Sequence, residues 1–148
     1  FTEQQLASLT LFGNWQALLG AINNIIDNAF HACRANRPKG RDISIEVDVA
    51  LNPECEQQSL MLKVTATGSG IERADLTKVF EPFYTSKARG TGLGLAVAKT
   101  VISSFNGTID IKSVLDKGTQ MNINLPLRAQ DEHGESETPQ VLHHATGE

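Results

Sequence analysis

Two asparagines one helical turn apart are the residues that could hold a metal ion. Asn24 and Asn28 lie four positions apart inside an apolar helical pattern, and His31 follows three residues later. Residues at this spacing share one face of a helix. An amide oxygen can bind Mg²⁺ beside phosphate oxygens, because Mg²⁺ prefers hard oxygen ligands. The alternative is that both side chains cap neighbouring loops or sit at the helix edge, since a buried amide without a partner is costly.

A glycine-rich run is the second candidate for chemistry. Free amide N–H groups at the start of a helix suit an anion, most naturally phosphate, and Lys87 and Arg89 just upstream add positive charge. Neither the Walker spacing nor the dinucleotide fingerprint is present, so a phosphate here would belong to another architecture. Glycine clusters also open many helices for purely local reasons. The run consists of Gly90, Thr91, Gly92, Leu93, Gly94 and Leu95.

Length and composition are those of one ordinary soluble domain. The chain has 148 residues, of which 40% are hydrophobic and 20% charged, and this suffices for a core without cross-links. The net charge of −4 argues against nucleic acid or an anionic membrane as a partner. Cys33 and Cys55 lack metal-ligand spacing and are expected to be reduced thiols of a cytoplasmic domain. No apolar run approaches the roughly 18 residues of a membrane span.

The elements that must position these residues follow from hydrophobic periodicity. A helical pattern over residues 15–35 carries both asparagines, and Asn14 is placed to cap it. A second helical pattern over 93–105 follows the glycine run. Alternating patterns predict strands over 9–12, 42–51, 60–67, 108–114 and 120–127, and a short helix is expected over 75–79.

These elements predict an α+β fold of two layers. The strands over 42–51 and 60–67 are joined by a polar loop, which favours an antiparallel hairpin. Helices would then cover one face of a mostly antiparallel sheet. The first strand of this hairpin is expected to be half-buried, because apolar residues alternate with polar ones at Ile43, Ile45, Val47 and Val49.

The chain is expected to have three parts. Residues 1–8 would be a linker or the end of a preceding element, and residues 9–127 the folded domain. Residues 128–148 are polar, acidic and without periodicity, which is typical of a disordered tail or linker. The chain starts at Phe1 without an initiator methionine, and we expect it to be a piece of a longer protein.

The motifs occur in an order that resembles one family. A helix with Asn24 and Asn28 is followed by Gly68-Ser-Gly70-Ile71 at a strand end, by the segment Phe80-Glu-Pro-Phe83, by the glycine run and by Gly118-Thr119. Over about residues 9–127 this resembles the catalytic, ATP-binding domain of sensor histidine kinases. That domain belongs to the superfamily that includes DNA gyrase, Hsp90 and MutL. The resemblance implies the Bergerat-type ATP-binding fold, a two-layer α/β sandwich.

The resemblance also implies ATP and Mg²⁺ as ligands. Asn28 would hold Mg²⁺, with Asn24 beside it, and His31 stands where many relatives carry a basic residue that reaches the phosphates. Lys87 and Arg89 would contact the phosphates from a short lid. The remaining nucleotide-binding positions implied by the family are Ala66, Gly68, Gly70, Ile71 and Thr119 around adenine, and the run from Gly90 through Thr91, Gly92, Leu93 and Gly94 to Leu95 under the triphosphate.

Position 24 favours a kinase over an ATPase. ATP-hydrolysing relatives carry a glutamate there as a general base, whereas Asn24 cannot accept a proton. The implied function is that of a protein-histidine kinase, which transfers the γ-phosphate of ATP to a histidine on a separate dimerisation domain of the same protein. The family further implies a response regulator receiver domain as a partner, a homodimeric full-length protein and a cytoplasmic location.

One position departs from the family pattern. The family has an aspartate two residues before the first glycine of the Gly-x-Gly motif, where it accepts a hydrogen bond from the adenine amino group, and this chain has Ala66. The loss would lower the affinity by one to two orders of magnitude, because such a bond contributes roughly 1.5–3 kcal/mol. Selectivity for adenine over guanine would weaken too. Two explanations stay open: an engineered substitution, or a natural degenerate domain that acts as a protein-binding signalling module.

Overall fold

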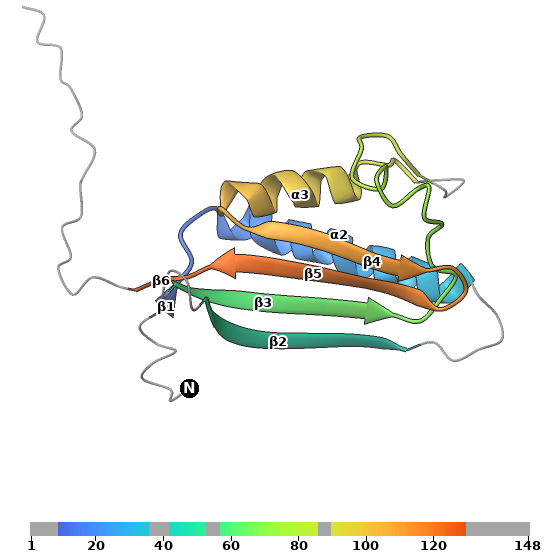
Figure 1. Ribbon diagram of the computed structural model, residues 1–148. Coiled ribbons are helices and arrows are strands. Elements are labelled where there is room, and N and C mark those ends of the chain that lie inside the picture. Colours follow the sequence, from blue (N-terminus) through green and yellow to red (C-terminus); the bar gives the residue numbers. More distant parts are fainter. Residues whose placement is uncertain (1–8, 36–41, 53–56, 86–89, 130–148) are drawn as a thin grey trace, which may run out of the picture.

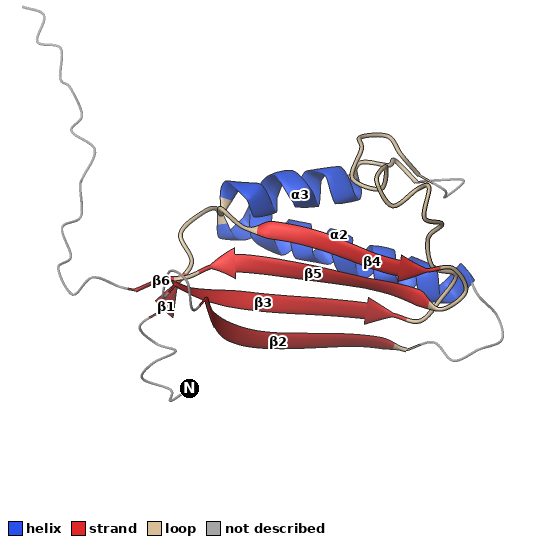
Figure 2. Ribbon diagram, viewed as in Figure 1, coloured by secondary structure: helices blue, strands red, loops and turns tan. Residues whose placement is uncertain are grey.

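The protein has two layers, a four-stranded antiparallel sheet and two helices that cover one of its faces (Figures 1 and 2). The structure is a computed structural model that describes residues 9–35, 42–52, 57–85 and 90–129. The strand order in the sheet is β2-β3-β5-β4. The α+β fold class expected from the sequence is confirmed. The elements are β1 (Leu9–Thr10), α2 (Trp15–Ala35), β2 (Ile43–Asn52), β3 (Gln57–Ala66), α3 (Gly94–Ser104), β4 (Thr108–Val114), β5 (Gly118–Pro126) and β6 (Arg128–Ala129).

Helix α2 has the bounds that the sequence predicted. The Asn14 side chain accepts a hydrogen bond from the backbone N–H of Ala17 at 3.1 Å, which satisfies one of the free donors at a helix start. Its buried positions recur every three to four residues and pack on the sheet. They are Leu18, Ala21, Ile25, Ala29 and Cys33.

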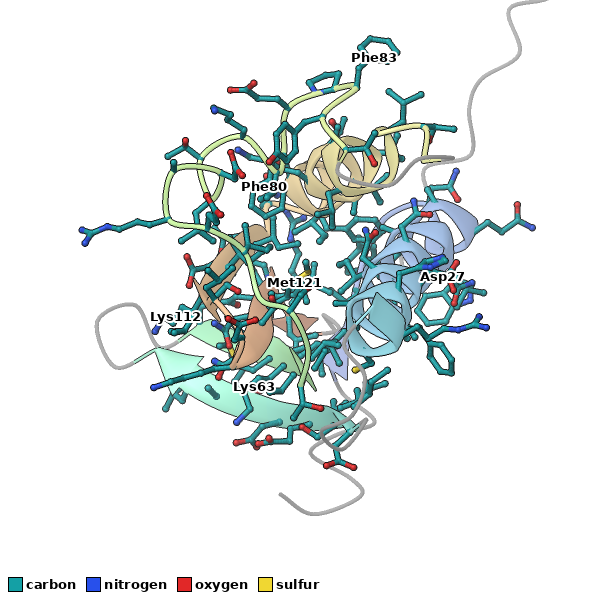
Figure 3. All side chains as sticks on the ribbon, turned by 90° about the vertical axis from the view of Figure 1, so that its right-hand side faces the viewer. Asp27, Lys63, Phe80, Phe83, Lys112 and Met121 are labelled. Carbon is teal, nitrogen blue, oxygen red and sulfur yellow. The ribbon has the colours of Figure 1, made fainter. Side chains whose placement is uncertain are left out.

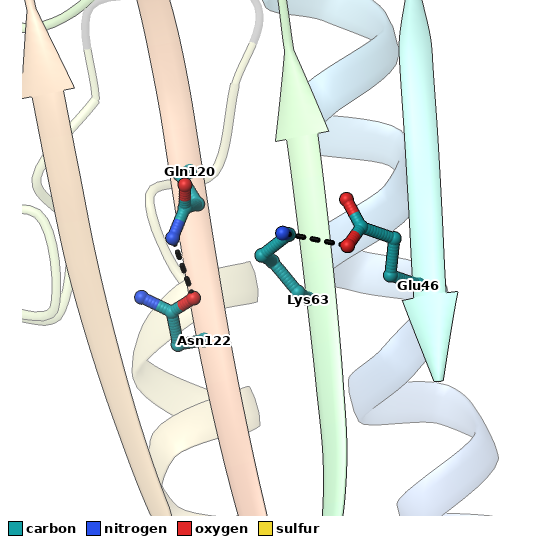
Figure 4. Close-up of polar contacts among 4 residues, drawn as sticks. All are labelled: Glu46, Lys63, Gln120 and Asn122. Carbon is teal, nitrogen blue, oxygen red and sulfur yellow. Dashed lines mark hydrogen bonds and ion pairs between the residues drawn. The ribbon is translucent and has the colours of Figure 1, made fainter. Parts of the chain in front are cut away.

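The sheet turns one face to the helices and the other to solvent. Met121, Ile123 and Leu125 of β5 are buried on the inner face, and Figure 3 shows Met121 between the two layers. The outer face is polar. Lys63 of β3 forms an ion pair of 2.6 Å with Glu46 of β2, and Gln120 donates a hydrogen bond of 2.7 Å to Asn122 along β5 (Figure 4).

Strand β2 differs from the expectation of a half-buried strand. It pairs with β3 in the predicted antiparallel hairpin, from Ile43 opposite Ala66 to Asn52 opposite Gln57. Yet Ile45 is 48% exposed and Val47 64% exposed. These residues are exposed because β2 is an edge strand of its sheet, and the helices lie mainly over the other strands.

The segment after the first glycine motif also differs from the expectation. A short helix over 75–79 was predicted, but residues 73–80 form successive turns. Most of the backbone bonds there span three residues, as from Lys78 N–H to the Asp75 carbonyl at 2.9 Å, and Val79 N–H makes a single bond of helical span to the same carbonyl at 3.2 Å. Pro82 follows, and Phe83 has a φ of 68°, so a helix cannot continue.

The described ends of the chain pair with each other. Leu9 lies opposite Ala129 and Thr10 opposite Arg128 in an antiparallel ladder, so strand pairing reaches two residues past the expected boundary at 127. The strand predicted over 9–12 therefore ends at Thr10. The expectations for 1–8 and 130–148 concern residues outside those described. Among the described residues, no helix is long and apolar enough to cross a membrane.

Candidate functional site

The two asparagines face the start of helix α3. A Cβ atom added to Gly94 would lie 3.7 Å from Cγ of Asn24 and 3.8 Å from its Oδ1, so this amide faces the first residue of α3. Asn28 lies one turn further along α2 on the same face. Both asparagines are half-buried. The structure therefore brings together Asn24 of the asparagine helix and Gly94 at the end of the glycine run, which are 70 positions apart in the sequence.

The first turn of α3 has no side-chain cap at Leu93. Leu93 is the N-cap residue and makes no side-chain cap hydrogen bond, and the first turn carries no acidic residue. The nearby hydroxyl of Thr91 accepts a bond of 3.4 Å from Leu93 N–H instead. The first N–H groups of a helix have no partner within the helix and lie at the positive end of its dipole. This end of α3, beside Asn24, is therefore suited to an anion.

Gly94 is a glycine that local packing does not explain. An added Cβ would meet only ordinary van der Waals contact, and its φ is not positive. Gly92 is different, because its φ is +68° and a Cβ would come within 2.4 Å of the Phe83 backbone. The carbonyl of Gly92 also accepts a bond of 2.9 Å from Phe83 N–H. The bare backbone at Gly94 leaves room for a ligand to approach closely.

The first glycine motif is fixed between α2 and the β4–β5 hairpin. A Cβ on Gly68 would lie 2.5 Å from the Ala32 carbonyl oxygen of α2, and one on Gly70, whose φ is +66°, would lie 2.1 Å from the Val114 carbonyl oxygen. The Ser69 carbonyl between them accepts a bond of 2.8 Å from Asp116 N–H. These contacts require glycine at both positions whether or not a ligand is bound.

A row of side chains crosses the inner face of the sheet beside this motif. Ala66, at the end of β3, lies opposite Thr119 of β5, which in turn lies opposite Ser113 of β4. Ala66 is 2% exposed and the two hydroxyl residues are half-buried. The Ser113 and Thr119 hydroxyls are 2.8 Å apart, and Ser113 also accepts a bond of 2.8 Å from Ile71 N–H.

Sequence reasoning missed Ser113. The signal was present in the short connection between the strands predicted over 108–114 and 120–127, because the hairpin it forms places Val114 opposite Gly118 and Ser113 opposite Thr119. Counting back from that turn would have put a second hydroxyl beside the expected adenine residue.

The segment Phe80-Glu-Pro-Phe83 lies in the loop before the glycine run. Phe80 lies against α3, where Lys99 Nζ is 5.3 Å from its ring centre. Phe83 is 76% exposed, and Figure 3 shows its side chain pointing away from the molecule. Partial burial and a hydrogen bond to the Asp75 carboxylate raise the pKa of Tyr84 above its usual 10.0. This bond ties the loop to the turns that follow the first glycine motif.

The remaining residues expected at the site have different surroundings. His31 is exposed on α2, and Leu95 packs against the core. Gly90 is half-buried in the loop before α3. Lys87 and Arg89 lie outside the described residues.

A hollow of about 650 Å³ lies next to the first glycine motif. Its lining comes from the segment after this motif and from the end of β4 with the residue that follows it, namely Ile71, Glu72, Arg73, Ala74, Leu76, Ser113, Val114 and Leu115. Its lining includes neither asparagine and no residue of the glycine run. It is therefore separate from the junction of α2 and α3.

Metal binding by protein groups alone finds no support in the described part of the chain. There, no three His, Cys, Asp or Glu side chains gather into a cluster that could hold an ion. A divalent cation at the asparagines would need oxygen ligands from a bound phosphate and from water, which Mg²⁺ commonly uses.

The fold and this site define a known class of protein. The family of histidine kinase-, DNA gyrase B- and HSP90-like ATPases matches residues 13–129, and the chain belongs to it. Its similarity lies on the histidine kinase side of that family, so the chain is a domain of the kind found in sensor histidine kinases. The family binds ATP.

Individual relatives are sensor kinases of bacteria. The chain is 37% identical over 109 residues to the sensor histidine kinase ZraS of Salmonella typhimurium, covering 74% of this chain and 22% of that protein. It is 33% identical over 117 residues to the sensor histidine kinase WalK of Bacillus subtilis, covering 75% and 18%. The chain thus spans about a fifth of the length of these relatives.

A solved structure shares the fold. The mycobacterial sensor histidine kinase MprB superposes with a TM-score of 0.65 at 28% sequence identity, covering 82% of this chain and 77% of that one.

Proposed function

We propose that this domain binds ATP with Mg²⁺ and delivers the γ-phosphate to a histidine on a separate dimerisation domain of the same protein. The observation that carries the proposal is the uncapped start of α3 against Asn24, with a glycine at position 94 that packing does not require. A triphosphate is the anion that would use both the free N–H groups and the amides.

Each residue of the junction has a role in this proposal. Asn28 would hold Mg²⁺, and Asn24 lies beside the start of α3. The backbone from Gly90 to Leu95 lies under the phosphates, with the lid residues Lys87 and Arg89 adding charge around them and His31 contacting them. Bound Mg²⁺ would neutralise charge that develops on the phosphates. The protein itself mainly positions the triphosphate, which suffices for much of phosphoryl transfer.

Transfer is favoured over hydrolysis by the residue at position 24. An amide cannot take a proton from water as a carboxylate can, so Asn24 offers no general base. The acceptor histidine would come from the dimerisation domain, and a response regulator receiver domain would take the phosphoryl group next. A homodimeric, cytoplasmic setting for the full-length protein belongs to the same proposal.

Ala66 favours a second candidate function. A buried methyl group stands where the family has its adenine-binding carboxylate, and a domain that binds nucleotide poorly could signal through protein contacts alone. The two functions differ in what restoring the carboxylate does.

A calorimetric titration with Mg²⁺ separates the two functions. ATP is titrated into this chain and into Ala66→Asp. The kinase proposal expects binding by both, tighter in the variant by about 10- to 100-fold. Absence of binding by both forms at millimolar ATP would refute it and leave the signalling module. Steady release of inorganic phosphate without any partner would contradict the assignment of Asn24.

A further inference from the structure

Exposed apolar side chains gather on one side of the protein, over the inner face of β2 and one flank of α2. Six large side chains there are about half exposed or more, and together they form an apolar shelf whose floor is β2 and whose wall is α2. A contiguous exposed apolar surface of this kind marks a site of interaction. The shelf residues are Ile45, Val47 and Leu51 of the floor and Trp15, Leu19 and Phe30 of the wall.

The wall of the shelf is the flank of α2 that faces away from α3. Asn24 lies beside Gly94 at the start of α3, and α3 packs on β4, at the opposite edge of the sheet from β2. Trp15, Leu19 and Phe30 lie on the far side of α2 from Asn24, because a helix turns once in 3.6 residues. The flank therefore stands above the uncovered inner face of β2.

The outer border of the shelf is a free strand edge. Among the described strands, β2 pairs only with β3. The backbone N–H of Val49 donates to the Asp48 carboxylate at 2.8 Å, so it points to the free edge and not to β3. Because alternate residues of a strand turn their N–H and C=O groups to the same side, those of Val47 and Leu51 point to this edge too. Such an edge can accept a further strand.

We infer that the shelf binds a second copy of this domain, with the two β2 strands antiparallel across a two-fold axis. This interface uses the same surface of both copies. Each apolar side chain of the floor gains apolar neighbours from the other copy, and the two shelves join into one trough. The homodimeric setting proposed above would keep two copies close together, but the inference does not depend on nucleotide binding.

The width of this trough suits the side chains that line it. Adjacent strands lie about 4.8 Å apart, and α2 packs mainly on β3, so the two α2 helices would lie about 14 Å apart. A helix with its side chains is about 10–12 Å wide. The long side chains of Trp15 and Phe30 can span the gap that remains.

Acidic side chains on the outer face of β2 select the register of the pairing. A pairing centred on Val47 would set Glu46 opposite Asp48 of the second copy, and like charges directly opposite are destabilising. A pairing centred on Val49 sets Asp48 opposite Ala50 of the second copy instead. In that pairing the Val49 N–H leaves the Asp48 carboxylate for a carbonyl of the other copy. Asp48 therefore competes with dimer formation.

The test measures the dissociation constant of the dimer by sedimentation equilibrium, from micromolar to millimolar concentration of the chain. Trp15 is the single tryptophan of the sequence, so its emission should shift to shorter wavelength as the dimer forms. Val47→Lys in the floor and Leu19→Lys in the wall should each raise the constant about tenfold or more, because each places a charge in the apolar trough. Both side chains are exposed in the monomer, and circular dichroism checks that both variants fold.

Val97→Lys is the matched control. Val97 is also about half exposed, but it lies on α3, and the constant should not change. Asp48→Ala tests the edge in the opposite direction. It removes the competing acceptor and should tighten the dimer about two- to tenfold.

Three results would overturn the inference. The first is a native chain that stays monomeric at millimolar concentration, which would leave the shelf to a different partner. The second is a dimer whose constant is unchanged in Val47→Lys or in Leu19→Lys. The third is a dimer that Asp48→Ala does not tighten. None of these results bears on ATP binding, so the proposed function is tested separately.

Discussion

The two glycine motifs of this protein are held in opposite ways. The first, Gly68 to Ile71, contacts α2 on one side and the β4–β5 hairpin on the other, and its backbone makes hydrogen bonds of 2.8 Å to both Asp116 N–H and Ser113 Oγ. The second, Gly90 to Gly94, is fixed at Gly92 by the Phe83 backbone, whereas a Cβ added at Gly94 would make only ordinary van der Waals contact with Asn24. One motif is part of the fold, and the other ends in an exposed helix start.

The difference separates two reasons for glycine. Where a Cβ would collide with backbone of the same protein, the glycine is required by folding, and no ligand need be invoked. Where nothing collides and φ is ordinary, a functional reason becomes the stronger explanation. Substitutions at single glycines can test this separation.

The largest effect is expected from Gly70→Ala. The added Cβ would lie 2.1 Å from the Val114 carbonyl oxygen, at a φ of +66°. We expect the free energy of unfolding to fall by about 2–4 kcal/mol, measured by urea denaturation. Gly20→Ala is the control, because nothing lies within 4 Å of that position in α2 and alanine favours a helix by about 0.8–1 kcal/mol. Equal stability of the two variants would show that the first motif is not fixed as described.

An intermediate effect is expected from Gly94→Ala, and on a different quantity. The unfolding free energy should change by less than about 0.5 kcal/mol, because the added Cβ meets only ordinary contacts at 3.7 Å or more. The affinity for ATP with Mg²⁺ should fall about tenfold, or roughly 1.4 kcal/mol, because the methyl group occupies the approach to the helix start. Calorimetry with ATP and Mg²⁺ measures the affinity of the native chain and of Gly94→Ala. An unchanged affinity would remove the functional reason for Gly94.

The smallest effect concerns Tyr84, which links the two motifs through Asp75. The folded state raises the pKa of this phenol, so it holds the proton more tightly than the unfolded state does. That contribution to stability is complete below pH 10 and is lost as the pH rises through the folded pKa. Native protein should therefore lose more stability than Tyr84→Phe between about pH 10 and 12. The measurement is the unfolding free energy of both proteins at several pH values. An equal loss of stability in the two proteins over this range would contradict the raised pKa.

Local patterns were enough to predict much of the fold. Helix α2 begins and ends where predicted because an Asn14 cap and a helical period coincide there. The hairpins follow from alternation and turn residues. The exposure of Ile45 and Val47 could not be predicted, because alternation tells which residues share a face and not which strand lies at the edge. That depends on β3 pairing with β5, far along the chain.

The candidate site was likewise predicted only in part. The asparagine spacing and the glycine run identified which residues could bind a triphosphate, and the structure places Asn24 against Gly94. The bond from Ile71 N–H to Ser113 Oγ could not be predicted from residue types, because only the folded chain brings the first glycine motif against β4.

The edge strand β2 has a consequence for self-association of the domain in solution. Its far edge has no ladder partner among the described strands, and Ile45, Val47 and Leu51 are about half exposed or more along it. A long apolar edge of this kind templates the addition of another strand. The isolated domain should accordingly self-associate through β2 as its concentration rises.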